Sequence, residues 1–119
     1  MDEQIREIYH SDEFDAYYNS LDSKIQEKYD YVEQIIRTQY VVNAKFVKIL
    51  EKTEFYEARV SVGKNEYRTI VFAIDSASFI ESRRILFLNS FMKKSTKDYK
   101  AEIRLARQIL NKYIKEDEA

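Results

Sequence analysis

The sequence of 119 residues contains no cysteine, no proline and a single glycine, Gly63. Without cysteine the chain can form neither a disulfide framework nor a thiolate metal site. With His10 as its one histidine, a histidine-built metal site is not expected either. Phosphate-binding loops of the P-loop and dinucleotide-binding types need several glycines, so those enzyme classes are excluded. We therefore expect no metal and no small-molecule cofactor.

Long apolar stretches are also missing from the sequence. No segment approaches the ~20 apolar residues of a membrane span. The first ten residues, MDEQIREIYH, lack the basic start and the apolar run of a signal peptide. We expect a cytoplasmic protein without a membrane partner. The length suits one domain, and residues 1–119 are expected to form it.

The net charge of −1 conceals two halves of opposite sign. Residues 1–58 carry 7 Lys/Arg and 13 Asp/Glu, whereas residues 59–115 carry 13 Lys/Arg and 5 Asp/Glu. Phosphate binding depends on local rather than overall positive charge, so the basic half is a candidate surface for nucleic acid. On charge alone, a solvated surface whose charges happen to be segregated is an equally weighted interpretation.

Two helices are predicted in the acidic half, after a short strand or extended lead-in at residues 3–10. Ser11 has the chemistry of a helix cap, and residues at i, i+3, i+4 and i+7 then form one apolar face: Phe14, Tyr17, Tyr18 and Leu21. A second helix is predicted from about Asp22 to Tyr40, with its own stripe of Ile25, Tyr29, Val32 and Ile36. Together they predict a helical hairpin near 11–20 and 22–40.

In the second half the hydrophobic period changes to two. This alternation predicts strands at residues 54–62, 66–74 and 83–92, joined by turns at Gly63-Lys64-Asn65 and at residues 75–78. Two short turns in succession predict an antiparallel meander. A last helix is predicted near 97–115, where Ser95 and Asp98 resemble a capping box. The expected fold class is α+β: a small twisted antiparallel sheet packed with an N-terminal helical hairpin and a C-terminal helix.

Three motifs follow one another along these strands: Tyr56-Glu57-Ala58-Arg59, Tyr67-Arg68 and Phe91-Met92-Lys93-Lys94. The ordered set, followed by an amphipathic helix, resembles the phage-derived, HigB-like branch of the RelE/ParE toxin superfamily. The resemblance covers residues 54–114 and extends loosely to the N-terminal helices. It implies a RelE-like fold and the toxin of a type II toxin–antitoxin system.

The resemblance also implies an activity and two partners. Such toxins are metal-independent endoribonucleases that cleave messenger RNA on the ribosome. The 2′-hydroxyl of the messenger attacks the neighbouring phosphate, and cationic side chains stabilise the developing charge. The partners would be a helix-turn-helix antitoxin and messenger RNA on the ribosome. Two alternatives remain: a ParE-like inhibitor of DNA gyrase without nuclease activity, and an inactive module that only binds the antitoxin.

The residues expected to be catalytic are Arg59, Arg68 and Lys94. If Lys64-Asn65 is a two-residue turn, Arg59 pairs with Ile70, and both arginines project from one face of the sheet. A three-residue turn would separate them. We expect Arg68 to contribute little to the core. A strand arginine is also commonly solvated or salt-bridged, and the partner of Arg59 would then be one of two acids: Glu57 or Glu66.

The residues expected to bind the substrate are Lys93, Lys97 and Arg104. Lys93 and Lys94 point in opposite directions at a strand end, and the pattern of the family favours Lys94 as the catalytic one. Tyr99 stands where some relatives place a tyrosine that assists proton transfer, yet it also lies on an apolar stripe, and core packing is the favoured interpretation. The general base is unassigned, and His10 is expected at the surface.

Overall fold

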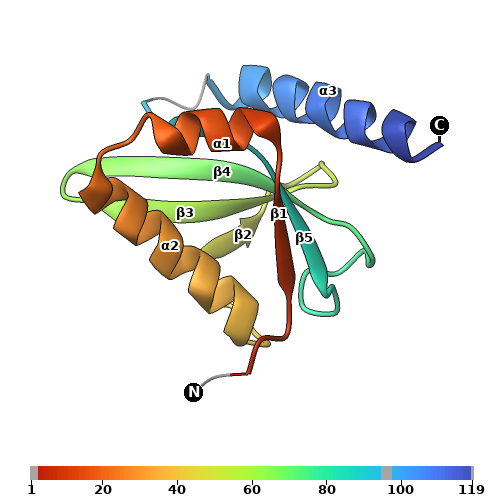
Figure 1. Cartoon of the computed structure of the whole chain (residues 1–119), viewed down its shortest axis with the longest axis horizontal. Coiled ribbons are helices and arrows are strands. Elements are labelled where there is room, and N and C mark those ends of the chain that lie inside the picture. The colour runs from red at the N-terminus through yellow and green to blue at the C-terminus, as the bar shows by residue number, and fades with distance from the viewer. Residues whose placement is uncertain (1–2, 95–97, 119) are drawn as a thin grey trace.

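The computed structural model describes residues 3–94 and 98–118 and has a mixed α+β fold, as predicted (Figure 1). Along the described chain the elements are β1 (Glu7–His10), α1 (Asp12–Asn19), α2 (Ser23–Thr38), β2 (Val47–Ile49), β3 (Tyr56–Val62), β4 (Asn65–Ala73), β5 (Arg84–Met92) and α3 (Asp98–Glu118). The strands form one sheet in the order β1-β5-β4-β3-β2. None of the described helices combines the length and the apolar character that crossing a membrane requires.

The centre of the sheet is the predicted meander, in which β3, β4 and β5 are consecutive antiparallel neighbours. Two further strands lie at its edges: β1, within the short strand or extended lead-in expected at residues 3–10, and β2, which the sequence did not place. β1 pairs with β5 in the parallel direction, with Glu7 opposite Arg84. β2 pairs with β3 in the antiparallel direction and contains three residues, so it covers only part of the edge of β3.

The helices pack on the two faces of the sheet. On one face, α1 and α2 contribute Phe14, Tyr29, Val32 and Ile36 to a buried cluster with residues of β3, β4 and β5. These side chains belong to the two predicted stripes, whose placement is thereby confirmed. On the other face, α3 contributes Ala106, Ile109 and Leu110 to a second cluster. Figure 1 shows α2 crossing in front of the sheet, with α3 lying apart from it and beside α1.

Side-chain caps fix where the first two helices begin. The hydroxyl of Ser11 accepts a hydrogen bond from the backbone N of Phe14 at 2.9 Å, and the carboxylate of Asp22 accepts one from Ile25 at 3.1 Å. Each cap satisfies a donor that the helix leaves unpaired. The backbone N of Ser11 also donates to Phe87 in β5, which ties the start of α1 to the sheet. The predicted cap at Ser95 lies outside the described residues.

Arg6 anchors the start of the chain to two other segments. It is 1% exposed, and its guanidinium donates to six backbone carbonyl oxygens, those of Ile36, Gln39, Tyr40, Phe79, Ile80 and Ser82. Three of these carbonyls lie at the C-terminal end of α2, where the helix dipole favours a cation. Burial, and then the charge of Arg83, lower the pKa of Arg6. The other three acceptors, the carbonyls of Phe79, Ile80 and Ser82, lie in the segment that precedes β5, and their hydrogen bonds to Arg6 hold that segment in place.

Candidate functional site

The β3–β4 hairpin places Arg59 directly opposite Arg68. The turn consists of Gly63 and Lys64, and Gly63 adopts a φ of 60°, a left-handed conformation that glycine reaches without a Cβ clash. The turn thus lies within the predicted segment Gly63-Lys64-Asn65 and has two residues, but it begins one residue earlier than the Lys64-Asn65 alternative, so the register differs by two positions from the one that alternative implied. A shift of two preserves the face, so both arginines still point to the side of the sheet that α3 covers.

Glu57 lies at the centre of a polar cluster between β3, β4 and α3. Its Oε2 accepts a hydrogen bond of 2.7 Å from the hydroxyl of Tyr99 and lies 3.8 Å from Nε of Arg68. Its Oε1 lies 3.6 Å from Nε of Arg59. The two arginine contacts are ion pairs that are longer than hydrogen bonds. A carboxylate that is only 8% exposed thus holds two strands and one helix together electrostatically.

Arg68 is a buried residue, contrary to the expectation that it would contribute little to the core. Its side chain is 2% exposed, and its Nη1 donates to the carbonyl of Tyr67 at 2.9 Å. Nη2 lies 3.6 Å from Glu66, while Nε has no hydrogen-bond partner among the residues that the structure describes. The buried guanidinium of Arg68 stabilises the negative charge of Glu57. Removing either side chain would leave the other charge buried and unpaired, which lowers the stability of the folded state.

An open cavity of about 380 Å³ lies next to this cluster. We call it the Glu57 cavity, and it is lined by Lys48, Ile49, Leu50, Glu51, Glu57, Arg59, Lys93 and Tyr99. Two carboxylates, a phenol, a guanidinium and two ammonium groups therefore belong to residues that line one space. Lys48 and Glu51 were not singled out in the sequence, because the short strand that carries Lys48 was not predicted.

The structure separates the cations that the sequence grouped together. Arg59 and Lys93 line the Glu57 cavity, whereas Arg68 lies buried and does not. Lys94 is exposed and is not part of the lining, and the same holds for Arg104 in α3. Lys97 lies outside the described residues. Of the two neighbouring lysines, the structure thus brings Lys93 to the cavity, whereas the family pattern favoured Lys94.

Tyr99 combines the two roles that the sequence analysis set against each other. Its ring packs edge-to-face on Phe91, with centroids 5.5 Å apart, so the ring belongs to the core below α3. Its hydroxyl reaches the Glu57 cavity and donates to Glu57. Burial, together with this hydrogen bond, raises the pKa of Tyr99 to about 12. Tyr99 therefore keeps its proton at neutral pH and remains a hydrogen-bond donor.

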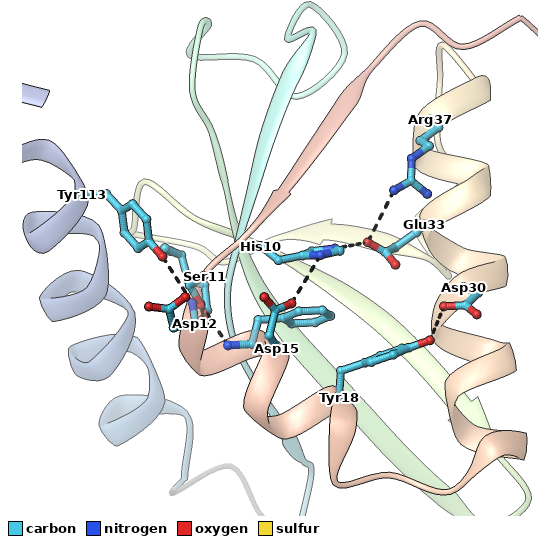
Figure 2. Close-up of polar contacts among 11 residues, drawn as sticks. His10, Ser11, Asp12, Asp15, Tyr18, Asp30, Glu33, Arg37 and Tyr113 are labelled. Carbon is cyan, nitrogen blue, oxygen red and sulfur yellow. Dashed lines mark hydrogen bonds and ion pairs between the residues drawn. The ribbon is translucent and has the colours of Figure 1, made fainter. Parts of the chain in front are cut away.

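A second polar cluster surrounds His10 on the face of the sheet that α1 and α2 cover (Figure 2). His10 is half-buried rather than free at the surface: its ring stacks on Phe14 at 4.7 Å and contacts Glu33 in α2 through a hydrogen bond. Asp15 lies 3.6 Å from its other nitrogen. Within residues 3–94 and 98–118, no group of three His, Asp or Glu side chains is arranged to hold a metal ion. The His10 cluster joins three elements and is separate from the Glu57 cavity.

The fold and the site define a small α+β protein whose central hairpin carries a buried carboxylate between cations and a phenol. Residues 16–111 match the family described as phage derived protein Gp49-like (DUF891), and the chain belongs to that family. This family is one of RelE/HigB-like toxins, so the membership is compatible with a toxin of a toxin–antitoxin system. No curated protein and no solved structure matches the chain significantly.

Proposed function

We propose that this chain is the toxin of a type II toxin–antitoxin system and that it cleaves messenger RNA on the ribosome without a metal. The observation that carries the proposal is the convergence of Glu57, Tyr99, Arg59 and Lys93 on one cavity. Cleavage by the 2′-hydroxyl requires a base for that hydroxyl, cations for the phosphate and a proton for the leaving 5′-oxygen. The Glu57 cavity contains a candidate group for each requirement.

Glu57 is the proposed general base, and Tyr99 is the proposed general acid. As the 2′-oxygen forms its bond to phosphorus, its proton passes to the carboxylate of Glu57. The bond from phosphorus to the 5′-oxygen breaks, and that oxygen takes the proton of Tyr99. The products are a 2′,3′-cyclic phosphate and a 5′-hydroxyl. Return of the proton from Glu57 to Tyr99 along their 2.7 Å hydrogen bond restores both groups for the next cycle.

Arg59 and Lys93 are the proposed phosphate ligands, because both line the Glu57 cavity. A phosphate in transfer spreads negative charge over several oxygens, which two cations stabilise better than one. Buried Arg68 is a positioning residue in this scheme, since it acts through the carboxylate of Glu57. Lys94, Lys97 and Arg104 stay predicted contacts of a longer stretch of messenger. The ribosome would supply the alignment of the substrate, and the reaction would take place in the cytoplasm.

The family implies an antitoxin partner, and an apolar groove offers a place for it. The groove has a volume of about 650 Å³ and lies between α3 and the sheet. We call it the Ile114 groove, and it is lined by Tyr9, His10, Phe72, Ile74, Arg84, Leu86, Leu110, Tyr113 and Ile114. Three of its apolar residues, Tyr9, Ile74 and Ile114, remain exposed.

We propose that an apolar segment of a helix-turn-helix antitoxin covers the Ile114 groove. Exposed apolar side chains that gather in one groove are typical of an interaction surface. No residue lines both the groove and the Glu57 cavity. An antitoxin bound in the Ile114 groove would not fill the Glu57 cavity. It would instead inhibit cleavage sterically, by preventing the toxin from entering the ribosome.

Inhibition of DNA gyrase is the alternative function. The pairing of Glu57 with Tyr99 beside two cations favours the nuclease, because a gyrase inhibitor has no use for proton transfer at this cavity. The two functions are separated by adding the purified chain to a cell-free translation reaction and to a gyrase supercoiling reaction. We expect protein synthesis to stop while supercoiling continues. Arrest of supercoiling with intact translation would establish the alternative.

A further inference from the structure

A second cavity lies on the other side of Arg59, at the open edge of β3. Its volume is about 330 Å³, and we call it the Tyr31 cavity; it is lined by Lys28, Tyr31, Val32, Lys45, Phe46, Arg59, Val60 and Ser61. It exists because β2 begins only at Val47 and leaves the later part of β3 without a neighbouring strand on that edge. α2 packs beside β3 (Figure 1), and it contributes Lys28, Tyr31 and Val32 to the lining.

Two aromatic rings form part of the wall of the Tyr31 cavity. Tyr31 is 56% exposed, and its ring meets that of Phe46 edge-to-face, with centroids 6.0 Å apart. Phe46 is partly buried against the core, so it holds the ring of Tyr31 from behind. An exposed ring with a fixed neighbour offers a flat surface on which a nucleobase can stack.

The charges of the Tyr31 cavity are all positive. Lys28 and Tyr31 are three residues apart on α2 and share one side of the helix. The ammonium group of Lys45 lies 5.0 Å from the centroid of the Phe46 ring, and Arg59 closes the cavity at the strand. No Asp or Glu is among the residues that line it. The site is locally basic although most of its residues come from the acidic half of the sequence, and its cations and exposed ring together favour an anionic, aromatic ligand.

We propose that the Tyr31 cavity binds one nucleotide of single-stranded RNA, the neighbour of the phosphate that is cleaved. The inference rests on the proposed nuclease function and extends it. Arg59 lines both this cavity and the Glu57 cavity, so the two spaces adjoin at one residue of β3. Adjacent nucleotides of one strand would occupy them: the base stacks on Tyr31, and Lys28 and Lys45 contact its phosphate.

Ser61 gives the site a further means of holding a base. The backbone N of Arg59 donates to the carbonyl of Phe46 at 2.7 Å, toward the side on which β2 lies. Successive residues of a strand alternate in the direction of their backbone groups, so Ser61 directs its N–H and C=O to the same side. That side is the open edge at the Tyr31 cavity. A donor and an acceptor at this edge can meet the hydrogen-bonding edge of a base.

The test measures binding of a fluorescent 2′-O-methyl hexaribonucleotide to the full chain by anisotropy at low salt. Replacing Tyr31 with alanine should weaken binding about 5- to 100-fold, the effect expected for loss of one base–aromatic stack. Tyr31→Phe should keep most of the affinity, because the ring remains. Tyr40→Ala is the matched control, since Tyr40 is 49% exposed and lies outside the cavity. Lys45→Ala should weaken RNA binding more than Lys100→Ala. RNA binding by the Lys45→Ala variant should also depend less on salt concentration than binding by the wild type.

Equal binding by the Tyr31→Ala and Tyr40→Ala variants would overturn the proposal. So would failure of the wild-type chain to bind the hexanucleotide, or stronger binding of a polyglutamate peptide, which would identify the cavity as a site for an acidic protein segment. The same variants are then assayed on programmed ribosomes, where Tyr31→Ala should raise the toxin concentration needed for half-maximal cleavage. If RNA binds at Tyr31 but the wild type cleaves no messenger, the nuclease function fails while the assignment of the RNA site holds.

Discussion

The hydroxyl of Tyr99 in α3 donates a 2.7 Å hydrogen bond to Glu57 in β3, across a sequence separation of 42 residues. The bond joins the last helix to the central hairpin at the point where the Glu57 cavity opens. The cavity therefore has its full set of groups only when α3 is docked on the sheet. In the proposed mechanism, packing of the helix and proton transfer depend on the same residue.

Replacing Tyr99 with phenylalanine should separate these two contributions. The ring still packs on Phe91, so the fold should persist, but cleavage should fall about 10²-fold or more because the proton donor is lost. The fold raises the pKa of Tyr99 to about 12, above its unfolded value of 10.0. This contribution to stability is complete below about pH 10 and is lost as the pH rises toward 12. Urea unfolding from pH 8 to 12 should show a steeper loss in the wild type than in the Tyr99→Phe variant.

The two opposed arginines should respond differently to replacement. Arg59→Ala should keep the stability within about 1 kcal/mol, because the side chain is 30% exposed, but reduce cleavage about 10²–10³-fold. Arg68→Ala should lower the free energy of unfolding by about 3–5 kcal/mol, because it leaves buried Glu57 without its buried cation. Urea denaturation of the two variants, followed by a cleavage assay, provides the comparison. Equal stability of the two variants would show that Arg68 is not a buried support.

Arg6 should be as sensitive to replacement as Arg68, although it lies far from the Glu57 cavity in the sequence and is not part of its lining. Arg6→Leu leaves six carbonyl oxygens without their donor, and we expect it to cost about 3–5 kcal/mol of the free energy of unfolding. Arg83→Ala is the matched control, since Arg83 is exposed and lies over the ring of Tyr40. It should cost less than about 1 kcal/mol. A loss below 1 kcal/mol for Arg6→Leu, measured by thermal or urea unfolding, would contradict this account of the anchor.

The Ile114 groove should govern binding of the antitoxin without affecting cleavage. Ile114 is 43% exposed, so Ile114→Glu should fold normally and cut messenger at the wild-type rate. A charge in an apolar groove should weaken binding of the antitoxin at least about 10-fold. Isothermal titration of the purified partner measures the affinity, and Leu105→Glu, on an exposed part of α3 outside the groove, is the control. Unchanged affinity of the Ile114→Glu variant would place the antitoxin elsewhere.

Local patterns in the sequence predicted the parts of the fold that depend on nearby residues. The cap at Ser11, the start of the second helix near Asp22 and the apolar stripes of α1 and α2 follow from spacings within one or two helical turns. The parallel pairing of β1 with β5 was not predictable in this way, because it joins residues 77 positions apart, such as Glu7 and Arg84. The hairpin turn was predicted as the segment Gly63-Lys64-Asn65, but which two of these residues form it could not be predicted, because that choice depends on the register of the whole strand pair.

The candidate site was predictable only in part, for the same physical reason. Arg59 was identified from the sequence. Glu57 lies two residues before it, so both side chains are on one face of the strand. From this spacing Glu57 was considered only as a salt-bridge partner of Arg59. The burial of Arg68 and the contact between Tyr99 and Glu57 arise from the docking of α3, which local spacing does not reveal. The preference for Lys94 over Lys93 came from the family pattern, whereas the end of β5 turns Lys93 toward the cavity.

Glu57→Gln isolates the proton transfer that the mechanism assigns to this carboxylate. The amide oxygen can still accept the hydrogen bond of Tyr99 but cannot take a proton, so we expect cleavage to fall about 10²–10⁴-fold. Glu54→Gln serves as the control, because Glu54 is an exposed partner of Arg107 outside the Glu57 cavity. Primer extension on programmed ribosomes quantifies both variants. Cleavage by Glu57→Gln at the rate of Glu54→Gln would remove Glu57 from the mechanism.

The most direct test of the central claim is the chemistry of the ends that the wild-type chain produces. Purified toxin is added to ribosomes programmed with a defined messenger, and the fragments are analysed by primer extension and mass spectrometry. The proposed mechanism predicts cleavage with a 2′,3′-cyclic phosphate on one fragment and a 5′-hydroxyl on the other, and no cleavage when the attacking ribose is 2′-deoxy. An intact messenger, fragments with 5′-phosphate ends, or cleavage of the 2′-deoxy substrate would contradict it.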